Sequence, residues 1–289
     1  MSSREKLRPG KKLKKEKSKT RAFLERIASQ LRWLDPFTYT DIFLEKIGQK
    51  ENKLVAWPVE LFVAFITAWF LYLFFGFLLG TKTPAVVVMS GSMIPTFYRG
   101  DIMVLQGVSY DTLKAPEIVI NENIRGRRMR EYAVSYCSIG DNNELFECSK
   151  YFSQRCKGEI KTRKICVVST GECIEISKDA DIVVYFSDTL QEPIIHRAVA
   201  KIKANDGFFV LTKGDNVNTN CFIDQEAGLA SRAVPIEALD GKTIFMLPYL
   251  GYVKLFLMDD LPCIISNLIR SGSYTVCTRY WPDGRLGFG

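Results

Sequence analysis

The sequence is poor in histidine, because His196 is the only one among 289 residues. Any reaction that needs an imidazole base must therefore use His196. Cysteine pairs of the Cys-x-x-Cys type, which are typical of zinc sites, are also absent although the chain contains eight cysteines. Apolar residues make up 47% and charged residues 25% of the chain, so it is not disordered as a whole. We expect neither a metal nor a cofactor.

Acidic residues are scarce at the N-terminus, where the first 26 residues contain eleven Lys and Arg but only three Glu. This segment carries the whole excess of the net charge of +7. A Lys-rich tail suits anionic lipid headgroups, and nucleic acid is the weaker alternative. Helical spacing of apolar residues over 22–34 predicts an amphipathic helix on the membrane surface, or else a docking helix for a partner. We assign residues 1–53 to a basic cytoplasmic tail, with a second short helix around 41–50.

Charge is missing altogether between Leu61 and Leu79. A helix of this length measures about 29 Å, which is enough to cross the hydrocarbon core of a bilayer. A buried core helix is the alternative, but such a helix is rarely apolar on every face. We therefore predict a transmembrane helix over 54–80. Because Lys and Arg crowd its N-terminal side, the N-terminus is expected in the cytoplasm. The remainder would lie outside the cell membrane or, alternatively, in the lumen of the endoplasmic reticulum.

After Pro84 the chain consists of short β-branched and aromatic runs that are broken by turn residues. Such runs predict a mainly β fold, with an antiparallel β-sheet domain made of residues 84–120 and 178–258. The runs are Ala85–Met89, Asp101–Val108, Glu117–Ile120, Asp181–Phe186, Ile194–Lys203, Gly207–Lys213 and Lys242–Leu247. The apolar stretch Ile244–Met258 is open to three interpretations: core, a surface resting on the membrane, or part of a second span. Pro248 and Gly251 disfavour a continuous spanning helix there.

The polar segment 121–177 interrupts this domain and is interpreted as an inserted, Cys-rich lobe, and residues 259–289 as a C-terminal extension. The lobe contains Cys137, Cys148, Cys156, Cys166 and Cys173. Disulfides are the natural use of cysteines outside the cytoplasm, with free thiols and a metal site as alternatives. Because five is odd, at least one lobe cysteine must pair outside the lobe, with Cys221 as a candidate, or stay free.

Three short stretches contain residues that could do chemistry. Ser90 and Ser92 follow the run Val86–Met89, and Gly91 would permit a sharp reversal that holds Ser92 clear of the sheet. His196 stands in an otherwise apolar strand, and Asp215 lies in a Gly-Asp-Asn turn that precedes Asp224. Each stretch alone also fits a structural turn or a structural histidine.

Taken together and in order, these blocks resemble the type I signal peptidases of the endoplasmic-reticulum and archaeal kind. The blocks are Ser90-Gly91-Ser92-Met93-x-Pro95-Thr96 with Arg99-Gly100-Asp101, then Asp181–Tyr185, then Ile195-His196-Arg197, then Leu211–Asn216 with Asp224. The resemblance covers about residues 84–255, and the transmembrane helix precedes it where the family has one. In the bacterial branch of that family a lysine takes the position of His196, so the histidine indicates the Ser-His-Asp branch.

The resemblance implies roles for five residues. Ser92 matches the nucleophile and His196 the base, while the Ser90 hydroxyl and the Ser92 N–H match the oxyanion donors. Asp224 matches the aspartate that orients the histidine, and Asp215 a supporting aspartate. However, the stretch Val217–Phe222 makes the gap between the two aspartates longer than the family usually has. Asp215 therefore stays open as the orienting residue.

By the same resemblance the chain would be a membrane-bound serine endopeptidase of the signal peptidase I type. It would bind signal-peptide-bearing precursors as an added strand and cleave after small residues through an acyl-enzyme. Its partners would be these precursors, the lipid membrane, and a translocon or accessory subunits, but no nucleic acid. Two alternatives are a non-catalytic single-pass protein whose lobe binds a partner, and a relative that processes pilins or cleaves itself.

Overall fold

The computed structural model describes residues 35–140, 144–151, 156 and 159–271. It divides into two compact units, Met1–Phe74 and Phe75–Gly289, each of which is described by itself. The predicted amphipathic helix over 22–34, the rest of the tail up to residue 34, and residues 272–289 of the C-terminal extension lie outside the described residues.

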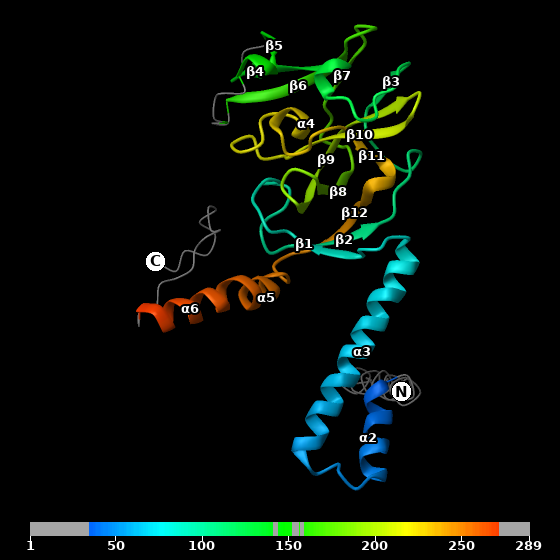
Figure 1. The fold of residues 1–289 in the computed structure, drawn as a ribbon, viewed down its shortest axis with the longest axis vertical. Coiled ribbons are helices and arrows are strands. Elements are labelled where there is room, and N and C mark those ends of the chain that lie inside the picture. The colour runs from blue at the N-terminus through cyan, green and yellow to red at the C-terminus, as the bar shows by residue number, and fades with distance from the viewer. Residues whose placement is uncertain (1–34, 141–143, 152–155, 157–158, 272–289) are drawn as a thin grey trace, which may run out of the picture. The chain divides into compact units, whose positions relative to one another are not determined.

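The first unit contains helix α2 (Pro36–Lys46) and most of helix α3 (Lys53–Leu79) (Figure 1). The sequence predicted a helix around 41–50, but α2 begins at Pro36 because Asp35 caps it. The Asp35 side chain accepts a hydrogen bond from the Phe37 N–H at 3.0 Å, and Pro36 has no N–H to leave unpaired.

Helix α3 is 27 residues long, and within the described part of the chain it alone is long and apolar enough to cross a membrane. None of its apolar window is buried, and side chains along its whole length, such as Leu61, Phe65 and Phe77, are exposed. This exposure suits a helix that faces lipid and contradicts the alternative of a buried core helix. The predicted apolar helix is confirmed, with its start at Lys53.

The second unit contains an eight-stranded and a four-stranded sheet (Figure 1). In the larger sheet the strands lie in the order β1-β2-β12-β8-β9-β10-β11, and β3 pairs with β9 in parallel. Its strands are β1 (Ala85–Val87), β2 (Ile102–Gln106), β3 (Glu117–Ile120), β8 (Ile182–Ser187), β9 (Glu192–Ala204), β10 (Gly207–Lys213), β11 (Val234–Pro235) and β12 (Leu239–Leu247). Each of the seven predicted runs overlaps one of these strands, although β8, β9 and β12 extend beyond their runs, so the mainly antiparallel β fold is confirmed.

The smaller sheet is formed by residues within 121–177 and has the antiparallel order β5-β4-β6-β7. Its strands are β4 (Ala133–Ile139), β5 (Phe146–Glu147), β6 (Ile160–Val167) and β7 (Cys173–Glu175). Short helices complete the unit: 3₁₀ turns at Met129–Glu131, Cys148–Tyr151 and Ile236–Ala238, α4 (Asp224–Ala227), α5 (Tyr252–Leu255), a π turn at Phe256–Asp260 and α6 (Leu261–Ser271).

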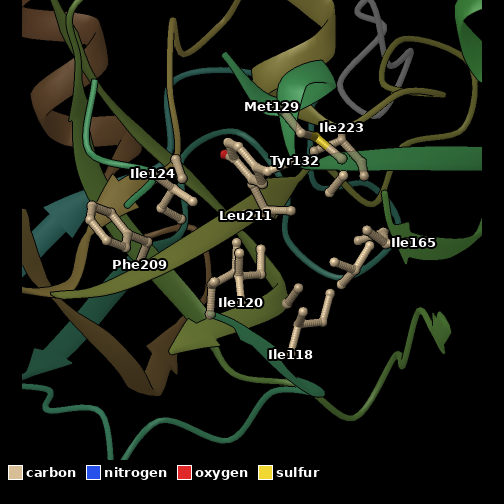
Figure 2. Packing of buried hydrophobic residues seen from close by; sticks show 14 of the residues in the cluster. Ile118, Ile120, Ile124, Met129, Tyr132, Ile165, Phe209, Leu211 and Ile223 are labelled. Atoms are coloured by element: carbon tan, nitrogen blue, oxygen red, sulfur yellow. The ribbon is translucent and has the colours of Figure 1, made fainter. Parts of the chain in front are cut away.

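One buried cluster joins the two sheets. Ile118 and Ile120 of β3 and Leu211 of β10 pack there against Ile165 of β6, and Ile223, which precedes α4, completes the contact (Figure 2). All five side chains are at most 1% exposed. The segment 121–177 therefore shares its core with the larger sheet, and does not form an independent hydrophobic core.

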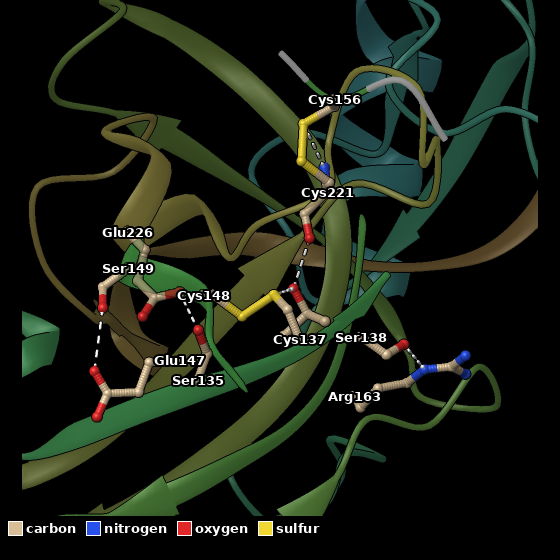
Figure 3. The surroundings of a disulfide bond; sticks show 11 residues. Ser135, Cys137, Ser138, Glu147, Cys148, Ser149, Cys156, Arg163, Cys221 and Glu226 are labelled. Atoms are coloured by element: carbon tan, nitrogen blue, oxygen red, sulfur yellow. Dashed lines mark hydrogen bonds between the residues drawn. A yellow bond between two sulfur atoms is a disulfide. The ribbon is translucent and has the colours of Figure 1, made fainter. Parts of the chain in front are cut away.

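The cysteines of this segment form disulfides. The pairs are Cys137–Cys148, Cys166–Cys173 and Cys156–Cys221 (Figure 3 shows two of them). The prediction of disulfides is confirmed, and of the two alternatives left open for the odd cysteine the structure shows a pair outside the lobe, with the candidate Cys221. This third pair ties the smaller sheet's segment to the chain between β10 and α4.

One local expectation needs correction. The first strand was expected over Ala85–Met89, but β1 ends at Val87, after which the pairing becomes irregular: the Val88 N–H donates to the Asp101 carbonyl and the Val88 carbonyl accepts from the Gly100 N–H, both at 2.9 Å. The chain does turn at Gly91, whose carbonyl accepts from the Ile94 N–H at 3.3 Å, but without a positive φ. The left-handed glycine of this region is Gly100, at φ 89°, where a Cβ would lie 2.3 Å from the Tyr252 ring.

The stretch Ile244–Met258 is not a continuous helix. Strand β12 occupies it up to Leu247, and α5 begins after a turn at Tyr249 and Gly251. Phe245, Tyr249 and Leu257 are all about half exposed or more, which contradicts the core interpretation.

We predict that Ile165→Ala lowers the free energy of unfolding by about 2–5 kcal/mol, since it leaves a cavity in the shared cluster. Because the cluster belongs to both sheets, the two should unfold in a single transition of lower midpoint. Thermal unfolding followed by circular dichroism measures this. The matched control is Ile139→Ala, which removes a side chain that is 37% exposed in the same small sheet. Equal midpoints for the two variants, or a separate early transition for the small sheet, would contradict the shared core.

Candidate active site

Ser92 lies in the turn between β1 and β2. The N–H groups of Thr96 and Phe97 donate to the Met93 carbonyl at 2.8 and 3.1 Å, which closes a tight turn directly after Ser92. Met93 is fully buried and packs in one cluster with Val184 of β8. Ser92 itself is half-buried, and the exposed Ser90 hydroxyl donates to its Oγ at 3.3 Å. The buried Met93 thus fixes the turn on the sheet while the two hydroxyl groups stay accessible.

The loop that follows β10 holds the serine turn from the other side. The Asn216 N–H donates to the Ser92 carbonyl at 2.9 Å, and the Asn216 side-chain amide donates to the Gly91 carbonyl at 2.8 Å. A Cβ on Gly214 would lie 2.7 Å from the Ser92 carbonyl oxygen, so a larger residue there would push the loops apart. The two predicted stretches, around Ser92 and around Asp215, are therefore in direct contact.

His196 lies on the central strand β9, opposite Val183 of β8, and is 2% exposed. Its Nδ1 is 2.6 Å from Asp224 Oδ2, and the Tyr185 hydroxyl donates to the same oxygen at 3.0 Å. Asp224 is the first residue of α4 and is fully buried. The structure therefore brings His196 and Asp224 together out of contact with solvent.

Asp215 makes a different set of contacts. It accepts two hydrogen bonds from the Arg197 guanidinium, at 2.8 and 2.6 Å, and one from the Thr96 hydroxyl at 2.6 Å. Paired donors of this kind hold a carboxylate in a defined orientation. Asp215 thereby connects the serine turn, through Thr96, with the residue that follows His196.

The structure thus distinguishes the two aspartates, whose roles the sequence left open, by their contacts. Asp224 lies against the His196 ring, whereas Asp215 binds the neighbouring Arg197. The extended stretch Val217–Phe222 does not draw Asp224 away from the histidine, because the chain returns to the sheet through Cys221 and α4.

The surroundings lower the pKa of both aspartates. Burial by itself raises the pKa of Asp224, but the positive charge that His196 can carry and the hydrogen bonds from His196 and Tyr185 outweigh it and hold this pKa below its ordinary value. For Asp215, burial again raises the pKa, and the hydrogen bonds from Arg197 and Thr96 together with the positive charges of Arg197 and Lys213 lower it more. The site therefore holds two buried or nearly buried negative charges.

Lys213, at the end of β10, is buried and donates to the Gly214 carbonyl at 2.8 Å. Burial lowers the pKa of its amine, while the charges of Asp224 and Asp215 act in the opposite direction. It is a second buried base candidate beside the carboxylates, and the hydrogen bond of its amine goes to a backbone carbonyl rather than to either carboxylate.

Within the described residues no hydrogen bond joins the Ser92 hydroxyl to the His196 ring, and the Ser92 Oγ instead accepts from Ser90. Catalytic hydrogen bonds are often long before a substrate binds. The described part of the chain also contains no group of three or more His, Cys, Asp or Glu that could hold a metal ion.

The sequence assigned no role to Tyr185, Arg197, Thr96 and Asn216, although all four contact the predicted residues. Each of them stands in one of the four blocks that carry the family resemblance. Their positions within those blocks were the only indication in the sequence that they contribute to the site. Their contacts depend on strand register, which the blocks do not reveal.

No family model matches the chain, but several curated proteins do. The human protein named signal peptidase complex catalytic subunit SEC11C is 33% identical over 85 residues, which are 26% of this chain and 44% of the relative. Its mouse counterpart is 30% identical over 129 residues, or 40% of this chain and 66% of the relative. The SEC11 protein of the fungus Leptosphaeria maculans is 30% identical over 125 residues, or 37% of this chain and 71% of the relative. The chain thus spans less than half of the human relative and more than two thirds of the fungal one.

We predict that Asp215→Asn destabilises the protein by about 3 kcal/mol at neutral pH, because it leaves the mostly buried Arg197 without its partner. A carboxylate whose folded pKa is depressed contributes stability above its unfolded pKa and loses it as the pH falls through the folded pKa. The difference between wild type and Asp215→Asn should therefore shrink below about pH 4. Denaturant unfolding from pH 7 to pH 3 measures it. Asp179→Asn, at an exposed carboxyl group, is the control, and a difference that stays constant down to pH 3 would contradict the assignment.

Proposed function

The chain belongs to the family of signal peptidase complex catalytic subunits, and from this premise we propose that it is a membrane-bound serine endopeptidase that removes N-terminal signal peptides. The observation that carries the proposal is the buried contact between His196 Nδ1 and Asp224 Oδ2, at 2.6 Å. A carboxylate in this position selects the tautomer in which Nε2 can accept a proton, and it stabilises the imidazolium that forms.

In the proposed reaction the Ser92 hydroxyl is the nucleophile. Its proton passes to His196 Nε2 as Oγ attacks the carbonyl carbon of the scissile peptide bond. The Ser92 N–H and the Ser90 hydroxyl, which lies 3.3 Å from Ser92 Oγ, donate to the oxyanion. His196 then gives its proton to the departing amine of the mature protein. Water, deprotonated by His196, hydrolyses the ester of the signal peptide on Ser92. We expect substrate binding to shorten the distance between Ser92 Oγ and His196 Nε2.

Asp215 supports this arrangement without contacting the histidine. Its bonds to Thr96 and Arg197 link the serine turn to the strand of His196, so it would keep the nucleophile and the base in register. The precursor is proposed to add as a strand beside the catalytic turn, with small side chains at the cleavage site. Strand β1, which lies at one end of the large sheet directly before Ser90, offers a suitable edge.

The setting of the proposed enzyme is the endoplasmic reticulum membrane, the alternative to the cell membrane. The relatives above are catalytic subunits of a complex from mammals and a fungus, which favours this membrane and accessory subunits as partners. Helix α3 would be the anchor and would raise the effective concentration of the site near membrane-bound signal peptides. We propose residues 84–120 and 178–258 as the catalytic domain and 121–177 as its inserted lobe.

We predict that Ser92→Ala and His196→Ala each abolish cleavage, since no other histidine exists to act as the base. Asp224→Asn should lower kcat by about 10⁴-fold because the amide favours the wrong tautomer. Asp215→Asn, the matched change at the other aspartate, should cost far less. Cleavage of a radiolabelled precursor by the full-length chain, purified from membranes with any accompanying subunits, measures all four variants. Full activity of Ser92→Ala would exclude the enzyme in favour of a partner-binding protein, and activity in His196→Ala would make Lys213 the base to test.

We predict that cleavage depends on small residues at the end of the signal peptide. A precursor with an Ala-x-Ala site should be processed, and the same precursor with bulky residues at both alanine positions should not. Mass spectrometry of the products identifies the cut bond. A pilin-type precursor without such a site is the comparison substrate. Preferential cleavage of that substrate would overturn the assignment to secretory signals.

A further inference from the structure

The segment that delivers Asp224 to the histidine has little support of its own. Between Lys213, where β10 ends, and α4 the chain belongs to no strand or helix, and α4 is only four residues long. Its local hydrogen bonds are short-range, such as those from the Thr219 and Asn220 N–H groups to the Asn216 carbonyl. Contacts from outside the segment must therefore hold Asp224 in place.

At the residues directly before Asp224, several of those contacts come from the inserted lobe. Cys221 is fully buried and joined to Cys156 by a disulfide (Figure 3). Its carbonyl accepts a hydrogen bond from the Thr162 hydroxyl of β6 at 2.6 Å. Phe222 packs in one cluster with Cys137, Cys148 and Ile160 of the lobe. The chain is thus fixed to the small sheet by a covalent bond, a hydrogen bond and a ring just before Asp224.

The residues around Asp224 alternate between the two sheets. Ile223 packs with Met129, Tyr132 and Ile165 of the lobe segment (Figure 2), and the Ser135 hydroxyl of β4 donates to the Glu226 carboxylate (Figure 3). Asp224 itself faces His196 of the larger sheet, and the Gln225 side chain accepts from the Thr212 N–H of β10 at 3.1 Å. The aspartate therefore enters the site from a strip of chain that is fastened to the lobe on both sides of it.

We propose that the inserted lobe is a clamp that positions Asp224 against His196, with Cys156, Cys221 and Thr162 as positioning residues. The inference rests on the proposed function for its effect on catalysis, but its structural part stands on these contacts alone. A displacement of the order of 1 Å in a catalytic group can cost about 10²-fold in rate. Loss of the clamp should therefore lower kcat and leave KM nearly unchanged, because none of the three residues belongs to the proposed precursor-binding edge.

The chain offers a matched control. Cys156→Ser/Cys221→Ser removes the disulfide between lobe and catalytic segment, whereas Cys166→Ser/Cys173→Ser removes one inside the β6–β7 hairpin of the same lobe. Assays use the full-length chain with its accompanying subunits. We expect kcat to fall by about 10²-fold for the first pair and by less than about twofold for the second. Equal kcat values for the first variant and the wild type would overturn the proposal.

A general loss of stability is separated from positioning by a double-mutant cycle with Asp224→Asn. If the clamp acts through Asp224, adding Cys156→Ser/Cys221→Ser to Asp224→Asn should change kcat by less than about twofold. If the combined variant instead loses kcat by the product of the two separate fold-losses, the disulfide acts on a part of the site other than Asp224, and the inference is overturned. If the double serine variant fails to fold, Thr162→Val replaces it in the cycle. Thr162→Ser, which keeps the hydroxyl, is its conservative control and should retain the wild-type kcat.

A second measurement does not depend on activity. The N–H groups of Glu226 and Ala227 both donate to the Ile223 carbonyl, so their hydrogen exchange reports whether α4 stays formed. Exchange should accelerate in Cys156→Ser/Cys221→Ser and in Thr162→Val, but not in Cys166→Ser/Cys173→Ser. Unchanged exchange would overturn the clamp. If the wild type cleaves no precursor, the proposed function fails, while this comparison still decides whether the lobe holds the segment of Asp224.

Discussion

Burying a carboxylate is costly unless hydrogen-bond donors meet it, and the geometry around His196 depends on one such group. Asp224 is fully buried, and its Oδ2 is met by the His196 ring and the Tyr185 hydroxyl, whereas its Oδ1 has no hydrogen-bond partner among the described residues. Both donors come from neighbouring antiparallel strands: Val183 of β8 lies opposite His196, and Tyr185 is two residues further along. Two residues along a strand return to the same face, so the register of β8 and β9 brings both donors to one oxygen.

Neighbouring residues of β9 anchor the two aspartates by the same alternation. His196 binds Asp224, and Arg197, whose side chain points to the opposite face of the strand, binds Asp215. A single strand thus fixes two negative charges without bringing them together, which would raise the pKa of one of them. Through Thr96, Asp215 also ties the serine turn to this strand. The spacing of the proposed nucleophile and base therefore depends on an ion pair that contacts neither of them.

The role proposed for the inserted lobe follows from the way in which the chain positions Asp224. A side chain on a strand takes its position from the hydrogen-bonded ladder, but Asp224, the proposed orienting residue, starts a one-turn helix after an irregular segment. Ile223 and Cys221 bind that segment to the small sheet, whose Ile165 belongs to the same cluster as Leu211 of the large sheet. An insertion that shares its core with the large sheet can hold Asp224 in a fixed position, whereas a lobe on a flexible tether could not.

Much of the secondary structure of this protein can be predicted from local sequence. The uncharged run that ends at Leu79 is apolar on every face of a helix, and each predicted β-branched run after Pro84 overlaps a strand. Hydrophobic period and composition are sufficient to predict both kinds of element. Counting also determined two facts: a single imidazole, and an odd number of lobe cysteines, of which one had to pair outside the lobe or stay free. The choice between Asp215 and Asp224, the contact of Tyr185 with Asp224, and the ion pair of Arg197 were decided only by tertiary structure. Those contacts join residues that no helical or strand period relates, and they arise from strand register and from a segment folded onto the lobe, neither of which leaves a local pattern.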